Sequence, residues 1–442
     1  MRFLPQNSYH LSDKLPTMRF EKGPRSWFAI LSARQKRSVN THILKYQYVE
    51  AVIMSLETLT KTVESRGFAC AVALTTLDRN RVTRAELYDQ FVENDTLIEY
   101  GHPESVTVSE PDGYAGEIPG MDRWRGRYTV SKPFVGVIHD AHLVGSPPLA
   151  VTGSGYVADA SVSPNVQTLN VINSVRESPK RIATGNGRRE DIDEAVLLHN
   201  SWDSGYFHWV AETLTRLEGV EQYTAETGRT PKLIVGPDLN SYQLDTLELL
   251  GYDSDDLIRW DATYCQVDRL VVPAMRREIN PPSPSPFSHQ WLRESLREQA
   301  LRAVDTSRFS DRVYISRNDA TSRRVLNERD AFKRLKQAGF ERYELSSMAV
   351  EETIALFAQA DCIVTPHGAG LTDLIYADNV SVVELMPVNR VNGIYYMLTK
   401  QVDGWYGYIG CETNESDLIV DIDDLEAMVD AALARDSVGQ LS

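Results

Sequence analysis

The stretch CIVTPHGAGLTDLIYADNVSVVELMP, residues 362–387, decides the fold because its character changes three times within one short segment. An apolar run ends at Pro366, a glycine-rich turn follows, and a helical run over 371–377 leads to a second apolar run over 381–387. Short apolar runs that alternate with helices predict a parallel sheet with helices on its faces. The turn therefore lies at the carboxyl end of a strand, where open parallel sheets bind ligands.

The same alternation extends outward on both sides of this stretch. We predict further strands over 134–145, 149–160, 194–200, 231–237, 267–273, 311–317 and 341–346. We predict helices over 205–223, 241–252, 291–304, 328–339, 350–360 and 421–436, the last with aspartates in its first turn. These elements make two successive α/β runs, so the predicted fold class is α/β.

A proline-rich segment, INPPSPSPFSHQ over 279–290, separates the two runs, and we expect a linker without regular structure there. We therefore predict three parts: an extension over 1–125, an N-terminal lobe over 126–285 and a C-terminal lobe over 286–442. Within the extension, the spacing of apolar residues over 43–65 favours a helix, whereas 99–120 is polar and turn-rich, so we expect an irregular or helical extension.

The formal net charge of −16 argues against a nucleic-acid partner, because nucleic-acid binders are usually basic. The first 45 residues depart from this balance, with nine lysines and arginines against Asp13 and Glu21. Such an arm suits contact with anionic lipid, but solvation or packing in a homo-oligomer explains it equally well. No apolar run reaches the ~18 residues of a membrane span, and no signal peptide is apparent, so we expect a cytoplasmic protein, with the inner membrane face as an open alternative.

The turn at 366–371 is typical of a phosphate site. Gly368 and Gly370 let the backbone approach a ligand, and the start of the next helix offers N–H groups to an anion. Asp373 stands where a dinucleotide fingerprint needs Gly or Ala, and no Walker lysine is present, so the pattern favours a nucleotide diphosphate over NAD or ATP hydrolysis. The alternative is a tight turn with a satisfied histidine. The residues expected to contact the diphosphate here are His367, Gly368, Ala369, Gly370 and Leu371.

Three further side chains fit the same site. Arg317 follows a predicted strand of the same lobe, so it converges with His367, and its guanidinium matches phosphate oxygens. Arg323 and Arg324 follow, and we expect one of these two to be solvated; we assign Arg324 to the ligand. Glu384 ends the next strand and would accept hydrogen bonds from ribose hydroxyls, unless it is an edge-strand surface acid.

The segment NSWDSGYFHWVAETLTRL, residues 200–217, contains the third group of interest. His208 and Glu212 are four residues apart on a predicted helix, so they share a face. Histidine is suited to take a proton from a hydroxyl near neutral pH, and a glutamate one turn away would orient it. Surrounding aromatics, Trp202 among them, would stack on sugars. The competing interpretation is an aromatic core with a buried, satisfied histidine.

No metal site is predicted. Cys70, Cys265, Cys362 and Cys411 lie far apart and form neither a zinc pattern nor a disulfide framework. The Asp253–Asp255 pair and two Asp-Ile-Asp runs imitate an Asp-x-Asp metal motif, but aspartate beside a helix start is a common cap.

Four of these stretches together resemble glycosyltransferase family 61, which includes capsular polysaccharide enzymes and eukaryotic xylosyl- and N-acetylglucosaminyltransferases. They are Asn200 to Glu212 with His208 between, VYISRNDATSRRVLNE, FAQADCIVTPHGAGLTDLIYA and VVELMP, in this order over roughly 196–390. The resemblance implies a GT-B-type fold, with two Rossmann-like lobes facing a central crevice. Residues 1–125 match nothing in this pattern.

The resemblance also implies a nucleotide-sugar donor as co-substrate, inversion at the anomeric carbon and no required metal or other cofactor. His208 then becomes the leading acceptor base with Glu212 as its partner, Arg317 and His367 the diphosphate site, and Glu384 a ribose contact. The acceptor would be a glycan or lipid-linked glycan of surface polysaccharide or protein glycosylation. Two alternatives remain: a transferase of a non-sugar group, and a non-catalytic glycan-binding scaffold on the same fold.

Overall fold

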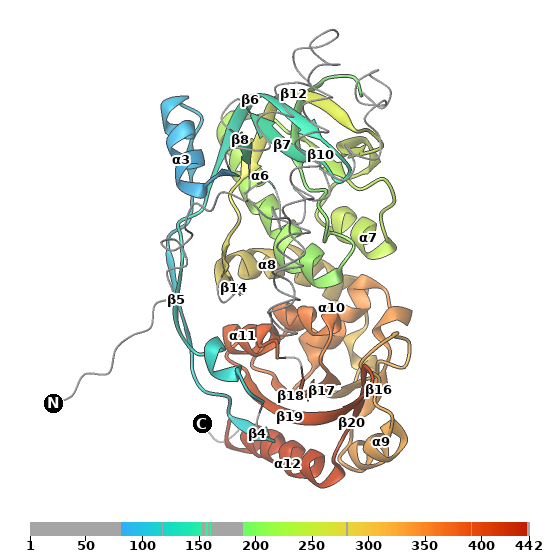
Figure 1. The fold of residues 1–442 in the computed structure, drawn as a ribbon. Helices are drawn as coiled ribbons and strands as arrows, with labels where there is room; N and C mark the ends of the chain where they lie inside the picture. The colour runs from blue at the N-terminus through green and yellow to red at the C-terminus, as the bar shows by residue number, and fades with distance from the viewer. Residues whose placement is uncertain are drawn as a thin grey trace, which may run out of the picture. The chain divides into compact units, whose positions relative to one another are not determined.

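The computed structural model describes residues 81–116, 118–152, 155–157, 160, 189–279, 282–389 and 391–439. The basic arm, the helix predicted over 43–65 and Cys70 lie outside these residues. The described chain is a mixed α/β fold, which confirms the fold class (Figure 1). The domain boundaries at 125 and 285 stay a prediction.

The first large sheet joins nine strands of the described chain and mixes parallel with antiparallel pairs, with a parallel pair of β1 and β8 at one edge. Strands β12, β9, β10 and β11 are mutually parallel, whereas β6, β7 and β8 pair antiparallel. The order is β1 (Arg81–Val82), β8 (Gly155–Val157), β7 (Leu149–Thr152), β6 (Phe134–Val144), β12 (Tyr264–Pro273), β9 (Ile192–Leu197), β10 (Lys232–Val235) and β11 (Leu257–Arg259), with β2 (Ile98–Glu99) also on β6. Its helices are α3 (Arg84–Glu93), α6 (Leu217–Thr227) and α7 (Ser241–Leu249).

The second sheet is parallel except at one edge. Its order is β16 (Glu341–Tyr343), β15 (Arg312–Ile315), β17 (Cys362–Pro366), β18 (Ser381–Pro387), β19 (Trp405–Asn414) and antiparallel β20 (Asp417–Ile419). Figure 1 shows α9 (Glu328–Gln337) and α12 (Ile422–Gly439) on one face, with α10 (Val350–Gln359) and α11 (Ile394–Gln401) on the other. Every residue of β17 and β18 is buried, as expected for strands covered on both faces.

The strand order of the second sheet fixes where a ligand binds. In chain order the five parallel strands from β15 to β19 lie 2-1-3-4-5, so the chain changes direction between β15 and β17. Crossover connections leave these two strands toward opposite sides, which opens a crevice at their carboxyl ends. Arg317 follows β15 and His367 follows β17, so both lie at this edge.

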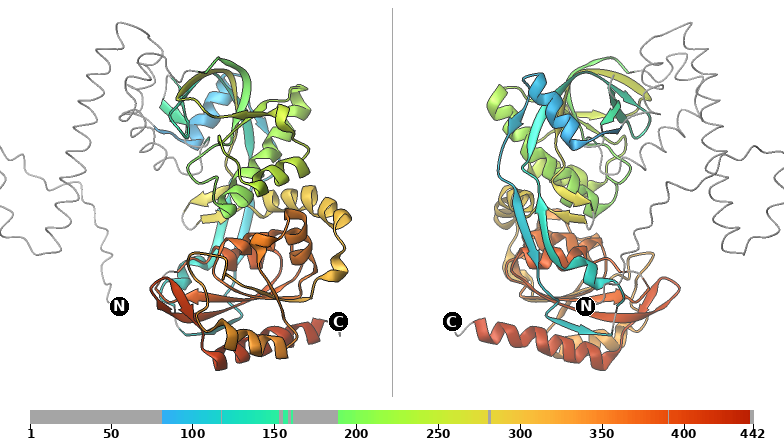
Figure 2. Two further views of the ribbon diagram at one scale, coloured as in Figure 1. Left: turned by 90° about the vertical axis from the view of Figure 1, so that its right-hand side faces the viewer. Right: turned by 60° about the vertical axis from the view of Figure 1, so that its left-hand side comes forward.

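Residues 99–120 are not irregular, and that prediction was wrong. Strand β3 (Glu104–Val108) pairs with β5 (Gly126–Val130), and β4 (Gly113–Ala115) adds to β19 of the second sheet. The chain therefore leaves the first sheet after β2, reaches the second at β4 and returns for β6; Figures 1 and 2 show the β3–β5 ribbon along this path. Alternate residues of β3 are buried, a pattern that the neighbouring proline and glycines obscured in the sequence.

The proline-rich segment also has regular structure. Strands β13 (Arg277–Ile279) and β14 (Pro282–Pro284) form an antiparallel pair, and helix α8 (Pro286–Ala303) starts directly afterwards. Proline is tolerated in a two-stranded ribbon because half of the N–H groups point outward, and at the first position of a helix because that N–H has no partner. The expected linker is thus an ordered connection.

A buried ionic cluster fastens this connection to the rest of the fold. The Arg276 guanidinium pairs with Glu104 of β3 and, at 2.9 Å, with Glu218 of α6. Hydroxyl groups of Ser285 and Ser288 donate to the same two carboxylates. The three charged side chains are 2–10% exposed, so the ion pairs are largely shielded from solvent.

Candidate functional site

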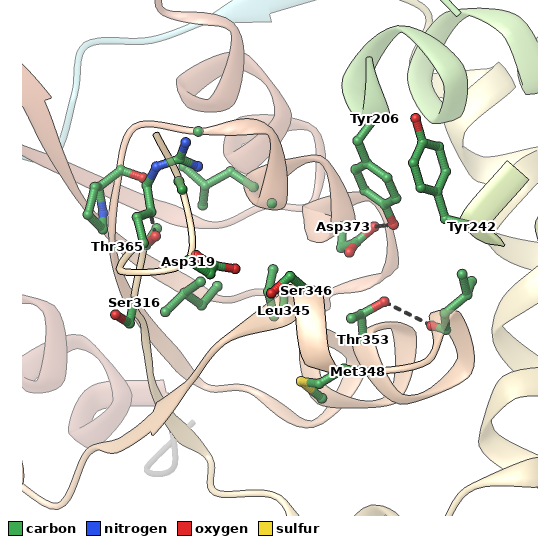
Figure 3. A pocket seen from close by; sticks show the side chains of 18 of the residues that line it. Tyr206, Tyr242, Ser316, Asp319, Leu345, Ser346, Met348, Thr353, Thr365 and Asp373 are labelled. Carbon is green, nitrogen blue, oxygen red and sulfur yellow. Dashed lines mark hydrogen bonds between the residues drawn. The ribbon is translucent and has the colours of Figure 1, made fainter. Parts of the chain in front are cut away.

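A cavity of about 310 Å³ lies at the carboxyl ends of β15, β16 and β17. Its wall comes mostly from the second sheet and its loops, while Tyr206, Ser241 and Tyr242 come from the chain around the first sheet (Figure 3). Leu345, Met348 and Val350 supply an apolar wall, and the polar groups gather near the strand ends. The lining also includes Ile315, Ser316, Arg317, Asp319, Ala320, Ser346, Thr353, Thr365, Pro366, Gly368, Gly370, Leu371 and Asp373.

The Arg317 guanidinium lies directly on the backbone of Gly368. A Cβ atom at position 368 would stand 2.1 Å from Arg317 Nη1, so only glycine admits this contact. Burial lowers the pKa of Arg317, and the nearby charge of Arg323 lowers it further. Arg317 forms no salt bridge with any carboxylate of the described chain; its Nε donates weakly to the Ser322 carbonyl at 3.4 Å. A partly desolvated cation in a cavity wall favours an anionic ligand.

His367 is held by a buried carboxylate. Its Nδ1 lies 2.5 Å from Oε1 of Glu384, and Tyr406 donates to the other oxygen, also at 2.5 Å. Glu384 is fully buried and His367 is 4% exposed; neither lines the cavity, and the carboxylate fixes the orientation of the imidazole next to the lining residues Pro366 and Gly368. With Nδ1 engaged, Nε2 is the ring nitrogen left to meet a ligand.

Asp373 links the two parts of the cavity wall. Tyr206, two residues before His208, donates to Asp373 Oδ1 at 2.7 Å, and Thr353 also hydrogen-bonds the carboxyl group. Figure 3 shows the hydrogen bond between Tyr206 and Asp373. Burial raises the pKa of Asp373 to about 7, and these two hydrogen bonds offset only part of the rise. The sequence drew attention to Asp373 only as a break in a dinucleotide motif, and offered no sign of its partner 167 residues away.

The structure brings His208 and Glu212 together, on a helix of unusual geometry. His208 Nδ1 lies 2.6 Å from Glu212 Oε2, and the side chains are 25% and 3% exposed. The expected regular helix over 205–223 begins instead as a π-helix, His208–Thr213, and continues through a 3-10 turn, Leu214–Arg216, into α6. π-Turns are rare and often occur at functional sites.

Side chains from outside the π-helix satisfy its widened turn. The Thr215 hydroxyl donates to the carbonyls of Ala211 and Glu212, and His289 Nε2 lies 3.4 Å from the Ala211 carbonyl. Asn200 Nδ2 donates to Thr213 Oγ1 at 3.3 Å. Thr215 is a local partner, but Asn200 and His289 come from 13 and 78 residues away, so local helical periodicity could not predict the π-turn.

Aromatic rings connect this dyad with the glycine-rich turn. The ring of His208 lies 5.4 Å from Phe207, Phe207 lies 6.0 Å from Tyr395, and Tyr395 lies 5.2 Å from His367, measured between ring centroids. Trp202 is 40% exposed and meets His208 edge-on at 4.5 Å. The dyad thus borders the region of the cavity without lining it.

Arg324, assigned to the ligand from the sequence, points elsewhere. Its Nε and Nη2 donate to Oδ2 of Asp417 at 3.0 and 2.6 Å, and this pairing raises the pKa of Arg324. It does not line the cavity. Among the residues that the sequence did not single out, Tyr242, Leu345 and Met348 line it. Leu345 and Met348 lie at and just after the end of a predicted strand, whereas Tyr242 lies at the start of a predicted helix.

Two of the three aspartate pairs act as caps, as predicted, whereas Asp191 and Asp193 lie at the start of β9 and not beside a helix. Asp253 accepts from the Asp255 N–H at the start of a 3-10 helix, and Asp421 accepts from the N–H of Asp423 at the start of α12. Within the described residues, no group of three or more histidine, cysteine or acidic side chains is arranged to hold a metal. In the same part of the chain, no helix combines the length and apolarity that crossing a membrane requires.

Comparison with protein families gives one match. The family described as Glycosyltransferase 61 matches residues 206–383, a segment that starts at Tyr206 and ends within β18. It therefore contains Arg317, Gly368 and Asp373 of the cavity, together with His367 and the His208–Glu212 dyad, which do not line it. No curated protein matches the chain.

Proposed function

Because the chain belongs to glycosyltransferase family 61 through residues 206–383, we propose that it transfers a sugar from a nucleotide-diphosphate donor to a hydroxyl group of an acceptor glycan. The observation that carries the proposal is Arg317 on Gly368, a cation without a carboxylate partner in the described chain, at the switch point of a parallel sheet. We place the diphosphate there and the base against the apolar wall of Leu345, Met348 and Val350.

The donor side stabilises the leaving group. As the bond between the anomeric carbon and the diphosphate breaks, its electron pair goes to the phosphate oxygen, so negative charge grows there. Arg317 donates to this charge, together with N–H groups at the start of the 3-10 helix Ala369–Tyr376. When His367 carries both ring protons, its Nε2–H adds a further donor, with Glu384 balancing the imidazolium.

The acceptor side supplies the base. With Nδ1–H donating to Glu212, the imidazole of His208 keeps a lone pair on Nε2, which takes the proton of the attacking hydroxyl. Attack opposite the diphosphate inverts the anomeric carbon. The exposed Trp202 beside His208 offers an aromatic surface for the acceptor sugar.

We assign the two sheets to the two lobes of a GT-B-type enzyme that acts without a required metal. Support comes from the cavity wall, to which Tyr206 and Tyr242 contribute from the chain around the first sheet, while the remaining wall belongs to the second. A lipid-linked acceptor, a place at the cytoplasmic membrane face and a homo-oligomer remain part of the proposal on sequence grounds, through the basic arm over 1–45.

The test is nucleotide binding followed by turnover. Calorimetry with a panel of nucleoside diphosphates, in buffer with EDTA, compares the wild type with Arg317→Ala and His367→Ala. The control is Arg312→Ala, at the other end of the same strand, whose guanidinium donates to the Ala338 carbonyl. We expect one diphosphate to bind the wild type and the control, and both site variants to bind it at least ~10-fold more weakly.

The base that binds then selects the sugar donors for turnover assays with the wild type and His208→Ala. If no diphosphate binds, or if Arg317→Ala binds the diphosphate as tightly as the wild type does, the assignment of the site is wrong. A non-sugar group transferase would bind a nucleotide yet release no sugar to any acceptor, and a scaffold protein would bind glycans without turnover.

A further inference from the structure

The donor that we propose contains a ribose, and the acid expected to hold the ribose hydroxyls is engaged elsewhere. Glu384 is fully buried, and its two oxygens are taken by Nδ1 of His367 and the hydroxyl of Tyr406. It does not line the cavity. A diol between a base and a diphosphate therefore needs another acceptor, on the cavity wall itself.

Asp319 is a carboxylate of this wall whose side chain has no bonded partner. It lies two residues after Arg317, and Figure 3 shows its side chain projecting into the cavity. Within the residues that the structure describes, the carboxylate makes no hydrogen bond and no ion pair. An aspartate in a turn commonly accepts from a nearby backbone N–H. Asp319 does not, so the local structure gives no reason for its carboxylate.

A tight turn fixes Asp319 beside Arg317. The Ala320 N–H donates to the Arg317 carbonyl at 3.0 Å, which places Asp319 at the third position of the turn. Glu328 at the start of α9 anchors this turn, because it accepts from the side-chain amide of Asn318. The carboxylate of Asp319 is therefore held in place before a ligand arrives.

Ser346 lines the same cavity from the loop after β16. Its hydroxyl also lacks a hydrogen-bond partner in the described ranges. This loop packs on the glycine-rich turn, since a Cβ atom at Gly370 would lie 2.7 Å from Leu345 Cδ1. Asp319 and Ser346 thus provide polar groups between the strand end at Thr365 and the apolar wall (Figure 3).

A carboxylate at this position discriminates between the parts of a nucleotide. It repels phosphate, which is anionic, and it only accepts hydrogen bonds, so it binds neutral groups that carry O–H or N–H donors. The two oxygens of one carboxylate can accept from both hydroxyls of a diol, and such charge-assisted hydrogen bonds are strong.

We propose that Asp319 binds the ribose hydroxyls of the nucleotide, between the diphosphate on Arg317 and the base against the apolar wall. This assignment rests on the proposed function and deepens it. It gives Asp319 two opposing effects on affinity. Contacts with the diol tighten the binding of a ribonucleotide, while the negative charge weakens the binding of any diphosphate.

The ratio of two affinities separates these effects. A ribonucleotide and its 2′,3′-dideoxy counterpart carry the same diphosphate, so the charge of Asp319 acts on both alike. Only the ribonucleotide has the diol. The ratio of their dissociation constants therefore reports the hydroxyl contacts, in the manner of a double-mutant cycle between protein and ligand.

The experiment measures this ratio by calorimetry on the full chain, in buffer with EDTA. The probes are ADP, CDP, GDP and UDP, and the dideoxy form of whichever binds the wild type. The variants are Asp319→Ala and Asp319→Asn. The control is Asp330→Ala, which removes an exposed carboxylate on α9 that does not line the cavity.

We expect the wild type and the control to prefer the ribonucleotide by about 10-fold or more, and Asp319→Ala by less than ~3-fold. Asp319→Asn should lie between them, because an amide keeps one acceptor oxygen. Asp319→Ala should also bind the dideoxynucleotide at least as tightly as the wild type does, since a repelling charge is gone.

A preference for ribose that survives in Asp319→Ala overturns the assignment, and so does a wild type without any preference. An effect confined to the complete nucleotide-sugar donor would assign the carboxylate to the transferred sugar. Binding that requires Mg²⁺ and is lost in Asp319→Ala would make it a metal ligand; either result also overturns the ribose assignment. Failure of the wild type to bind any of the four diphosphates refutes the proposed function itself, and is thereby distinguished from failure of Asp319 alone.

Discussion

The carboxyl group of Asp373 lies buried beside the cavity, between Tyr206 and Thr353. An ionised carboxylate there faces the same wall on which we place an anionic diphosphate, so the two charges oppose each other. A neutral Asp373 avoids this conflict and can still hydrogen-bond Tyr206. Since burial raises its pKa to about 7, the balance between the two forms changes near neutral pH.

We therefore predict that Asp373→Asn changes the pH dependence of stability. The folded protein holds the Asp373 proton up to about pH 7, whereas the unfolded chain loses it near the ordinary value of 3.8. Stability from this group is thus full below pH 3.8 and declines as pH rises to 7, by roughly 4 kcal/mol at most. Melting temperatures from pH 5 to 8 should fall more steeply for the wild type than for Asp373→Asn. Parallel curves would show that Asp373 ionises normally.

The His208–Glu212 dyad leads to a prediction about rate. Glu212→Gln keeps the size of the side chain but removes the charge that supports a developing imidazolium. We expect kcat to fall about 10²-fold or more with Glu212→Gln and with His208→Ala, with little change in the KM for the donor. Initial-rate kinetics with the identified donor measure both constants. A rise in KM at constant kcat would instead assign the pair to substrate binding.

At the scale of elements, the turn between β17 and the 3-10 helix Ala369–Tyr376 is shaped around Arg317. The contact between Gly368 and the guanidinium is close enough that a methyl group at 368 must displace Nη1. The displaced atom is the far end of a flexible side chain, so the fold tolerates the added methyl group. The guanidinium, however, must move from its position in the cavity wall.

We predict that Gly368→Ala weakens diphosphate binding about 10-fold with a small change in melting temperature. The decisive measurement is a double-mutant cycle with Arg317→Ala, because mutations that act through one contact are not additive. Adding Gly368→Ala to Arg317→Ala should cost no further affinity. Full additivity of the two losses would mean that the methyl group acts on the ligand directly.

Elements with a strong local signal could be predicted from the sequence. The strands β15, β17 and β18 were found because apolar runs alternate with helices, and their carboxyl-end residues Arg317 and His367 came with them. The π-helix at His208 and the role of Glu384 behind His367 depend on partners far along the chain, which no local pattern encodes. Arg324 was assigned to the ligand because no local pattern indicates its pairing with Asp417, 93 residues later.

At the scale of the whole described chain, the Arg276 cluster ties β3, α6 and the start of α8 to one point. Its two carboxylates are buried, so each depends on the guanidinium to balance its negative charge. Removing the cation leaves two like charges without solvent around them, which is the costly way to break a buried ion pair.

Arg276→Met should lower the free energy of unfolding by about 3–5 kcal/mol, seen as a large drop in melting temperature. Arg302→Met is the matched control, since its pair with Glu298 on α8 is exposed and is expected to contribute less than ~1 kcal/mol. Adding Glu104→Gln and Glu218→Gln to Arg276→Met should restore part of the loss. Equal melting temperatures for the two arginine variants would contradict the shielding of the cluster.

Strand β4 has a consequence for the order in which the protein is completed during synthesis. Asp112, beside β4, accepts from the backbone N–H of Tyr406, 294 residues later. A ribosome adds residues from the N-terminus, so β4 emerges long before its partner β19 exists. The second sheet therefore cannot complete its edge at β4 until β19 has been translated, and the long loop must then be closed at an entropic cost. Completion of the second sheet thus depends on a segment that was synthesised nearly three hundred residues earlier.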